Sequence, residues 1–385
     1  MEFSADANVL YGNACDVEVT RVGKATEVRF AADPHGGPEC LWFCFRVRRL
    51  EASSTNSVRL VLKHFGNLLG GSDLEKMRPV VRYDSGDWER LDPGVRMELP
   101  DGRVQGVWDV DAPETFFDAA LCYPYGRAEV DRLVRDAAGY WRKDTIGVSQ
   151  AGRPLVRLSN DPGAPGCARA GLYLVARQHS GETPGSWVLD GFLRRMAEFG
   201  DEAPLIWAIP LSNIDGVEQG DYGKDNFPYD LNRAWSHPPM RHETHVFGAD
   251  VRGWSNRCRP VLGIDFHAPG GCESDGVYTH VPDPKAYPEM HTAVSEWAEA
   301  IKADLTRLYA AEDFGRVAKY ASRWETPSFT KFFCATFEKP ALTLETPYAT
   351  CGETLMTCDS YRDVGARLAE TIAGRLGAAD DGGVS

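Results

Sequence analysis

Short apolar runs recur in the first third of the chain, and apolar and polar residues often alternate within them. Val17 and Val19, like Val28 and Phe30, are two positions apart, which is the period of a half-buried strand. Turn-forming sequences such as DPHGGPE and YDSGD separate the runs, and no amphipathic helix interrupts them. The pattern predicts a small antiparallel β-sandwich domain over residues 1–125. The runs lie at 15–22, 26–32, 41–50, 57–65, 79–84 and 103–110.

The pattern changes after residue 125 to helices that alternate with continuous apolar strands. In the segment 128–141, Val130, Leu133, Val134 and Ala137 share one helical face. Uninterrupted apolar runs are typical of strands that are covered on both faces of a sheet. We therefore predict an α/β domain over 126–376, followed by a disordered tail at 377–385 (GAADDGGVS). Its strands are expected at 171–177, 204–211, 261–266 and 341–346, and further helices at 184–199 and 291–310.

Composition narrows the class of protein. The 385 residues are enough for two domains, and a net charge of −14 argues against a nucleic-acid surface, which needs clustered Lys and Arg. No segment approaches the roughly 18 apolar residues of a membrane span. The N-terminus lacks the basic and apolar pattern of a secretory signal, and the 10 cysteines form no CxxC pair. We expect reduced thiols, a cytoplasmic location and no membrane partner.

Three residues at predicted strand ends suggest a metal site. His179 and Glu182 are three apart on a turn that Gly181 permits, where the strand 171–177 gives way to a helix, and the carboxyl ends of strands are where such sheets bind ligands. His267 directly follows the strand 261–266. Together they make a His₂Glu set, which leaves zinc a position for water. Alternatively, the HxxE pair is a chance surface match, and His267 is a strand-end histidine capped by a neighbour.

Further polar residues could serve catalysis. Glu345 ends the strand 341–346 and could act as general base on a metal-bound water. Asn232 and Arg233 together make a suitable clamp for a carboxylate, since Arg presents a planar fork of donors and Asn adds another. Arg233 could instead pair with Asp230.

A second histidine group, His237, His242 and His245, competes for the metal assignment. Its HETH sequence lacks the HExxH spacing of a zincin helix. Pro238 and Pro239 favour a loop, so we interpret this segment as an insertion at the rim of the site.

The order of these motifs resembles the zinc carboxypeptidase family, and more narrowly its cytosolic carboxypeptidase branch. It runs from HxxE through NxDG and DLNRxW to a strand ending in DFH and then TLET. LWFCFRVRRL looks like the signature strand of the N-terminal β-domain in that branch, and the resemblance covers roughly residues 8–375. It implies a mixed sheet flanked by helices, preceded by a β-sandwich.

Carried over by position, the resemblance implies one zinc ion per chain, held by His179, Glu182 and His267. Asn232 and Arg233 would bind the terminal carboxylate of a peptide, and Glu345 would be general base and proton shuttle. Members of the branch often remove glutamates from protein tails.

The chain departs from the family at two places. Gly223 stands where the branch usually has an Arg that polarises the scissile carbonyl, and Lys224 beside it either supplies that cation or is a solvated loop lysine. The loop after His267 is Gly-rich instead of basic, which puts glutamate specificity in doubt. Tyr320 and Tyr348 are the candidates for the family's flexible active-site tyrosine.

We therefore predict a zinc metallocarboxypeptidase that removes a C-terminal amino acid, acidic in one version of the hypothesis, from a peptide or protein. The first alternative is a zinc amidohydrolase acting on a small N-acyl amino acid or biosynthetic intermediate, which the missing Arg favours. The second is an inactive binding module, which the retention of all four zinc-site groups disfavours. A comparison of peptides with N-acyl amino acids as substrates would separate the first two.

Overall fold

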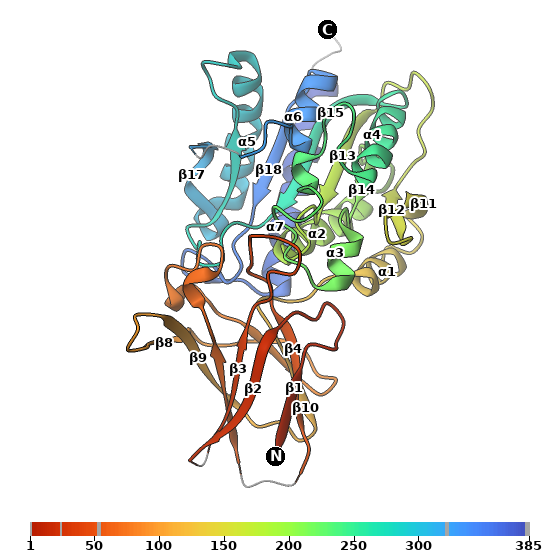
Figure 1. The fold of residues 1–385 in the computed structure, drawn as a ribbon. Coiled ribbons are helices and arrows are strands. Elements are labelled where there is room, and N and C mark those ends of the chain that lie inside the picture. The colour runs from red at the N-terminus through yellow and green to blue at the C-terminus, as the bar shows by residue number, and fades with distance from the viewer. Residues whose placement is uncertain (1, 24, 52–54, 320–322, 382–385) are drawn as a thin grey trace.

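Two five-stranded sheets form the N-terminal part of the protein, at one end of the molecule (Figure 1). The computed structural model describes residues 2–23, 25–51, 55–319 and 323–381. The first sheet has the order β1 (Phe3–Asp6), β4 (Cys44–Arg49), β10 (Phe116–Ala120), β6 (Val80–Tyr83) and β7 (Glu89–Arg90). The second has the order β2 (Cys15–Val22), β3 (Ala25–Ala31), β5 (Ser57–Leu62), β9 (Val104–Asp111) and β8 (Val95–Glu98).

The inner faces of these two sheets pack together through aromatic side chains. Phe30 on β3 lies 5.1 Å from Phe43 and 4.4 Å from Phe45 between ring centroids, and all three residues are buried. The alternating apolar residues Val28 and Phe30 of β3 therefore point into the core, as the sequence predicts. One pair of strands, β3 and β5, runs parallel within the otherwise antiparallel arrangement. The chain crosses through β4 in the other sheet between them, and such a crossover permits parallel pairing.

An eight-stranded mixed sheet forms the core of the larger part. Its four central strands, β14, β13, β15 and β18, are parallel, and the antiparallel strands β12 and β16 flank them. The full order is β11 (Arg142–Val148), β12 (Pro154–Ser159), β14 (Leu205–Ile209), β13 (Ala170–Ala176), β15 (Arg259–His267), β18 (Ala341–Glu345), β16 (Val277–Val281) and β17 (Ala310–Val317).

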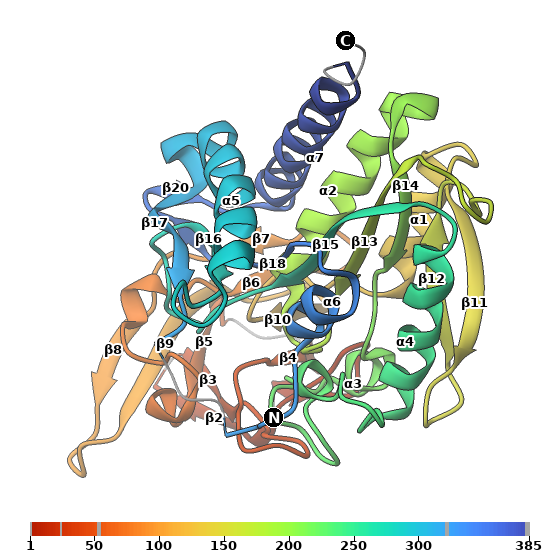
Figure 2. The same ribbon diagram turned by 90° about the horizontal axis from the view of Figure 1, so that it is seen from above.

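Helices cover both faces of this sheet (Figure 2). On one face α2 and α7 approach closely at Gly191 and Gly365, where an added Cβ would lie 2.1 Å and 2.0 Å from the other helix's backbone, and α5 packs beside α7. On the other face, α4 and α6 pack against the central strands. The helices are α1 (Arg127–Asp136), α2 (Thr183–Phe199), α3 (Ile214–Gln219), α4 (His242–Ser255), α5 (Pro288–Tyr309), α6 (Phe329–Phe337) and α7 (Cys358–Asp381).

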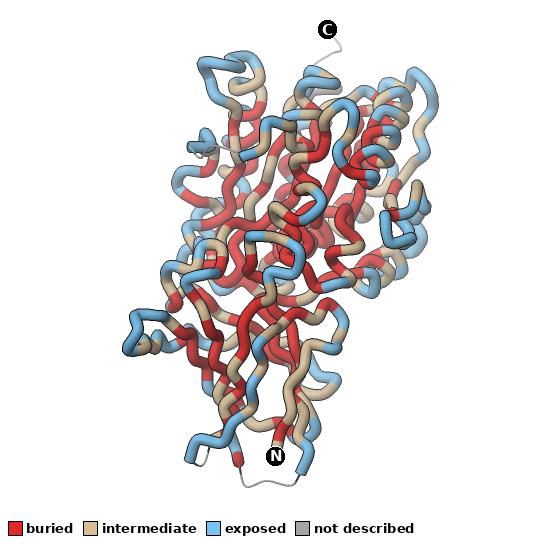
Figure 3. The backbone as a smooth tube through the Cα atoms, viewed as in Figure 1, coloured by how far each residue is buried: buried red, intermediate tan, exposed pale blue. Residues whose placement is uncertain are grey.

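The central strands are buried on both faces, as their uninterrupted apolar sequences predict. Every residue of β13 is buried. In Figure 3, where buried residues are red, the middle of the sheet is accordingly red. In β15, Phe266 faces α2, where Phe192 lies 6.3 Å away between ring centroids. Gly263 faces Phe333 of α6 instead. His267 is on the Gly263 side of the strand, because side chains alternate between faces. The predicted mixed sheet flanked by helices is confirmed.

Most predicted elements begin and end within three residues of the expected positions, but the helix expected at 128–141 ends at Asp136, and α3, α4 and α6 were not predicted. The expected domain boundary near 125 falls between β10 and α1. Residues 377–381, which were expected in a disordered tail, continue α7, and residues 382–385 lie outside the described residues. None of the described helices is long and apolar enough to cross a membrane. The short elements are the 3₁₀ turns η1 (Phe65–Asn67), η2 (Leu74–Lys76), η3 (Gly200–Glu202) and η4 (Leu231–Arg233), and strands β19 (Thr350–Cys351) and β20 (Thr354–Leu355).

Candidate metal centre and active site

The candidate site residues gather at the carboxyl ends of the central parallel strands. His179 follows β13 after a short turn, His267 is the last residue of β15, and Glu345 is the last residue of β18. His267 and Glu345 are paired in the β15–β18 ladder, so their side chains leave the sheet on the same side. Three segments that are distant in sequence thus meet at one edge of the sheet, as is usual for ligand sites on open α/β sheets.

His179, Glu182 and His267 form a buried cluster whose potential ligand atoms all lie within 4.8 Å of one another. The two oxygens of Glu182 each face one histidine. Oε1 is 2.8 Å from Nδ1 of His179, and Oε2 is 2.6 Å from Nδ1 of His267. The two Nδ1 atoms and the carboxylate therefore converge on one point.

The turn that carries two of these residues is shaped by close backbone contacts. A Cβ on Gly181 would lie 2.8 Å from the ring of Tyr222 and 2.9 Å from Trp42, so glycine is needed there. Helix α2 starts directly after Glu182, with a proline in its first turn. The helix start thus holds the backbone of Glu182 so that its carboxylate faces both imidazoles.

A carboxylate lies behind each imidazole. Nε2 of His179 is 3.2 Å from Asp230, and Nε2 of His267 is 2.8 Å from Asp265. A carboxylate that accepts the Nε2 proton leaves the Nδ1 lone pair directed toward the centre of the cluster, which is the arrangement that metal-binding histidines use. From the sequence, Asp230 is a candidate partner of Arg233 only, and the structure instead brings it to His179.

The electrostatics of the cluster favour a cation. Burial alone would lower the pKa of His179, but Glu182 and Asp230 outweigh it and raise the pKa. Burial would raise the pKa of Glu182, but His179 and His267 hold that pKa well below its usual value. With both imidazoles neutral, three carboxylates leave an excess negative charge that a divalent cation would offset. The N₂O donor set fits zinc, which accepts imidazole nitrogen and carboxylate oxygen together.

Asn232 is turned inward. Its amide nitrogen lies 2.9 Å from Nε2 of His267 and 3.0 Å from Asp265, and its oxygen accepts from Gln178 at 3.0 Å. The backbone N–H of Phe329 also donates to that oxygen at 3.0 Å. Both ends of the amide are thus engaged within the protein. Direct contact between Asn232 and a substrate stays a prediction, and it would require these hydrogen bonds to exchange.

Arg233 is less buried than Asn232 and is not enclosed by hydrogen-bond partners in the same way. It is half-buried, and its Nη1 donates to the carbonyl of Asn232 at 2.8 Å. Within the described ranges, no carboxylate lies at ion-pair distance from Arg233. Asp230 instead accepts from the backbone N–H groups of Asn232 and Asp225 and faces His179. The guanidinium therefore retains donors for a carboxylate ligand.

Glu345 occupies a mostly enclosed position, with 14% of its side chain exposed. Burial, with Glu182 adding to it, raises its pKa to about 7, although His267, Lys224 and His179 act in the opposite direction. Its Oε2 is buried without a hydrogen-bond partner in the described part of the chain. Nε2 of His280, on β16, lies 3.9 Å from its Oε1. A carboxylate with a pKa near neutrality can both accept and return a proton.

The backbone at Gly223 does not admit an arginine in its present conformation. Gly223 has φ of +88°, and a Cβ there would lie 2.3 Å from the hydroxyl of Ser180 and 2.5 Å from its backbone nitrogen. No larger side chain fits this conformation. Lys224, the next residue, is close enough to act electrostatically on both Glu345 and His280.

Two tyrosines lie near the cluster: Tyr222, which no motif singles out, and Tyr348, one of the two candidates for the flexible active-site tyrosine. The hydroxyl of Tyr222 lies 3.4 Å from Oε1 of Glu182. The hydroxyl of Tyr348 is buried without a partner in the part of the chain that the structure describes, and Glu182 and Glu345 both act on it electrostatically. Tyr348 is thus near the cluster but enclosed, and Tyr320 lies outside the described residues.

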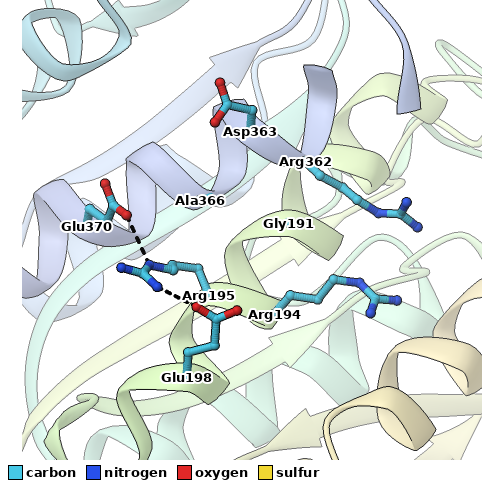
Figure 4. Close-up of a pocket in the computed structure, with 8 residues that line it drawn as sticks. All are labelled: Gly191, Arg194, Arg195, Glu198, Arg362, Asp363, Ala366 and Glu370. Atoms are coloured by element: carbon cyan, nitrogen blue, oxygen red, sulfur yellow. Dashed lines mark hydrogen bonds and ion pairs between the residues drawn. The ribbon is translucent and has the colours of Figure 1, made fainter. Parts of the chain in front are cut away.

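The second histidine group forms no metal cluster among the described residues. The segment expected to be a loop begins α4 at His242, which lies 2.9 Å from the carbonyl of Val148 through Nε2. His245 is on the same helix. None of the cluster residues lines the surface depression between α2 and α7 that Figure 4 shows. Its Arg195 is paired with Glu198 and Glu370, so it offers no unbalanced charge.

Comparisons with known proteins agree with the resemblance. No family model matches the chain. Human cytosolic carboxypeptidase 6 is 29% identical over 227 residues, which is 53% of this chain and 44% of that protein. The chain spans about half the length of the curated relatives it matches. The predicted similarity to the zinc carboxypeptidases, in their cytosolic branch, is confirmed by these relatives.

Solved structures share the fold over nearly the whole chain. A metallo-carboxypeptidase from Burkholderia cenocepacia has a TM-score of 0.77 at 18% identity and covers 98% of this chain and 100% of its own. A metallo-carboxypeptidase from Pseudomonas aeruginosa, in complex with (2-guanidinoethylmercapto)succinic acid, has a TM-score of 0.72 at 20% identity and covers 97% and 99%. The likeness includes the N-terminal sheets as well as the mixed sheet.

Proposed function

We propose that this chain, similar in sequence to cytosolic carboxypeptidases and in fold to metallo-carboxypeptidases, is a zinc-dependent carboxypeptidase. It would remove one amino acid from the C-terminus of a peptide or protein. The observation that carries the proposal is the convergence of Nδ1 of His179, Nδ1 of His267 and the Glu182 carboxylate beside Glu345. These groups would make a metal centre and a base at one edge of the sheet.

His179, Glu182 and His267 would hold one zinc ion per chain. Bound there, zinc would polarise the scissile carbonyl and lower the pKa of water. Asp230 and Asp265 keep the two imidazoles oriented, through the contacts at their Nε2 atoms.

Glu345 is the general base of the proposal. Its raised pKa and its place on the same side of the sheet as His267 support this role. Glu345 takes the proton of the attacking water and returns it to the amine that leaves. Lys224 is proposed to stabilise the negative charge that develops on the carbonyl oxygen, in place of the arginine that Gly223 excludes.

Arg233 is proposed to bind the substrate's terminal carboxylate, because its guanidinium is not paired with a carboxylate in the described structure. The carbonyl of Asn232 accepts a hydrogen bond from Nη1 of Arg233 and so helps to hold the guanidinium. The side chain of Asn232 contacts the substrate only if its amide exchanges its present hydrogen-bond partners. Orientation of this kind contributes several kcal/mol to catalysis. Lys224 and Arg316 add positive charge near Glu345 and His280, which suits an acidic C-terminal residue.

A second candidate is hydrolysis of a small N-acyl amino acid. The closed position at Gly223 favours it, because the usual oxyanion cation is absent there. Both reactions use the same metal centre and base, so only the substrate distinguishes them.

The test is a substrate panel for the zinc-loaded protein. The panel should contain peptides that end in Glu, Asp, Gly, Lys or an aromatic residue, their C-terminally amidated forms, and N-acyl amino acids. Release of a free C-terminal amino acid from peptides but not from amidated forms supports the carboxypeptidase. Turnover of N-acyl amino acids alone supports the second candidate, and no turnover of any substrate by zinc-loaded protein contradicts both.

A further inference from the structure

We propose that the loop Leu69–Gly71 of the N-terminal sandwich positions the segment that follows His267, and that the sandwich is thereby part of the catalytic apparatus. The inference rests on the proposed function, since it concerns the same metal centre. It assigns a role to a domain that carries none of the site residues.

The contact joins two backbones directly. The N–H of Gly271 donates to the carbonyl of Leu69 at 2.9 Å. Gly70 has φ of +72°, and a Cβ there would lie 2.7 Å from Cα of Gly270. From the other side, a Cβ on Gly270 would lie 3.0 Å from Cα of Gly70. Glycine on both sides is thus required for this approach.

Side chains of the sandwich enclose the same segment. A Cβ on Gly271 would lie 2.6 Å from Cδ1 of Leu41 and 3.3 Å from Cε of Met77, and both side chains are buried. Cys272 is buried as well; burial raises the pKa of its thiol, against hydrogen bonds from the backbone of Asp73 and Ser72. The segment therefore has little freedom to shift without moving the sandwich.

This segment begins at a residue that holds a metal ligand. The N–H of Ala268 donates to Oε2 of Glu182 at 3.2 Å, the same oxygen that faces Nδ1 of His267. A displacement of residues 270–272 would be passed along the short chain to Ala268. Glu182 would then lose a donor that sets the direction of its carboxylate.

The same edge of the sandwich reaches the other two site loops. Trp42 packs against Gly181 in the turn between His179 and Glu182, and its indole donates to the carbonyl of Tyr11 at 2.9 Å.

The loop that carries Lys224 is attached at both ends. The amide of Asn13 donates to Gly220 at 2.8 Å, and the N–H of Phe227 donates to the carbonyl of Gly36 at 2.7 Å. These contacts lie where the N-terminal sandwich meets the part that contains the mixed sheet (Figure 1).

The test compares Gly70→Ala with Gly102→Ala. Both glycines have positive φ, +72° and +83°, but a Cβ on Gly102 meets nothing within 4 Å, so the control carries the backbone strain without the contact. Zinc affinity is measured by competition with a chelator, kcat and KM at saturating zinc, and Tm for stability. Gly70→Ala should raise the zinc dissociation constant about 10–100-fold, the range for loss of a group that orients a ligand. It should lower kcat more than it changes KM, while Gly102→Ala stays near wild type in zinc affinity and kcat.

If Gly70→Ala does not fold, Gly270→Ala gives the same test with a milder approach of 3.0 Å and no positive φ. Zinc affinity and kcat equal to those of Gly102→Ala, in a folded Gly70→Ala or Gly270→Ala, would overturn the inference. That result leaves the proposed function intact. A wild-type protein that binds no zinc would instead overturn the proposed function, so the two failures are distinguishable.

Discussion

His267 and Glu345 are directly paired residues at the ends of the adjacent parallel strands β15 and β18. The ladder fixes the separation of their backbones, and both side chains emerge on the same side of the sheet. The proposed metal ligand and the proposed base, held this way, need no loop movement to come together. Functional groups on strands are positioned more accurately than those on flexible loops.

Replacing Glu345 by Gln should lower turnover by about 10²–10⁴-fold and leave zinc binding intact. The amide keeps the shape of the side chain but cannot accept the proton from water, and general-base catalysis contributes about 10²–10⁴-fold in rate. Steady-state kinetics and metal analysis of the same preparation check both parts. Glu299→Gln, at an exposed position of α5, is the matched control. Unchanged turnover in Glu345→Gln would remove this residue from the mechanism.

Asp265→Asn should weaken zinc binding through His267. The substitution removes the charge that faces Nε2 at 2.8 Å, so the ring is less firmly oriented and Nδ1 is less basic. We expect a loss of about 10–100-fold in affinity, measured by chelator competition. Asp359→Asn, whose side chain is 95% exposed, serves as the control. Equal affinities in the two variants would mean that Asp265 serves packing alone.

Lys224→Ala should lower kcat if its ammonium stabilises the developing oxyanion. Loss of one such donor costs about 2.7–4 kcal/mol of transition-state stabilisation. Lys224→Arg should restore part of the rate, because it returns the positive charge. A rate for Lys224→Ala within twofold of wild type would show that Lys224 is an ordinary loop residue.

Arg233→Ala should reduce discrimination in favour of a free C-terminus. A charge-assisted hydrogen bond contributes about 1.5–3 kcal/mol, so kcat/KM should fall for peptides with a free carboxylate. Any residual activity on the amidated peptides should change little. The ratio of the two kcat/KM values is the measurement. An unchanged ratio would assign carboxylate binding to another residue, with Asn232 the first to examine.

The metal-free protein should lose stability as pH rises from about 4.5 to 7. Burial raises the pKa of Glu345 from 4.5 to about 7, so in this window the folded state binds more protons than the unfolded state. Stability then falls with increasing pH, by up to about 3 kcal/mol for this group alone. Chemical denaturation of chelator-treated protein at several pH values measures the trend. In Glu345→Gln the decline over this window should be smaller, and an identical decline in both proteins would contradict the assignment.

Local sequence patterns were sufficient for the elements that carry the site. The mostly apolar runs at 171–177 and 261–266 are two central strands, and they place His179 and His267 at strand ends. The run at 341–346 does the same for Glu345. Burial on both faces leaves a direct trace in composition, so these positions could be predicted.

Contacts between distant segments could not be predicted from local sequence patterns. From the sequence, Asp230 is a candidate partner of Arg233 only, but the fold brings it to Nε2 of His179, 51 residues away in sequence. Gln178, which joins Asn232 to Asp265, belongs to no motif. The glycine at position 223 is one sequence signal that could be used, since a glycine in place of a functional arginine suggests a backbone conformation that other residues cannot adopt, and the φ of +88° agrees.

Zinc titration of the metal-free wild-type protein, with activity assayed at each step on the best substrate of the panel, tests the central claim most directly. We predict that activity rises linearly and reaches its plateau at close to one zinc per chain, and that a chelator removes both together. Full activity in the metal-free preparation, or zinc binding that leaves activity unchanged, would contradict the account.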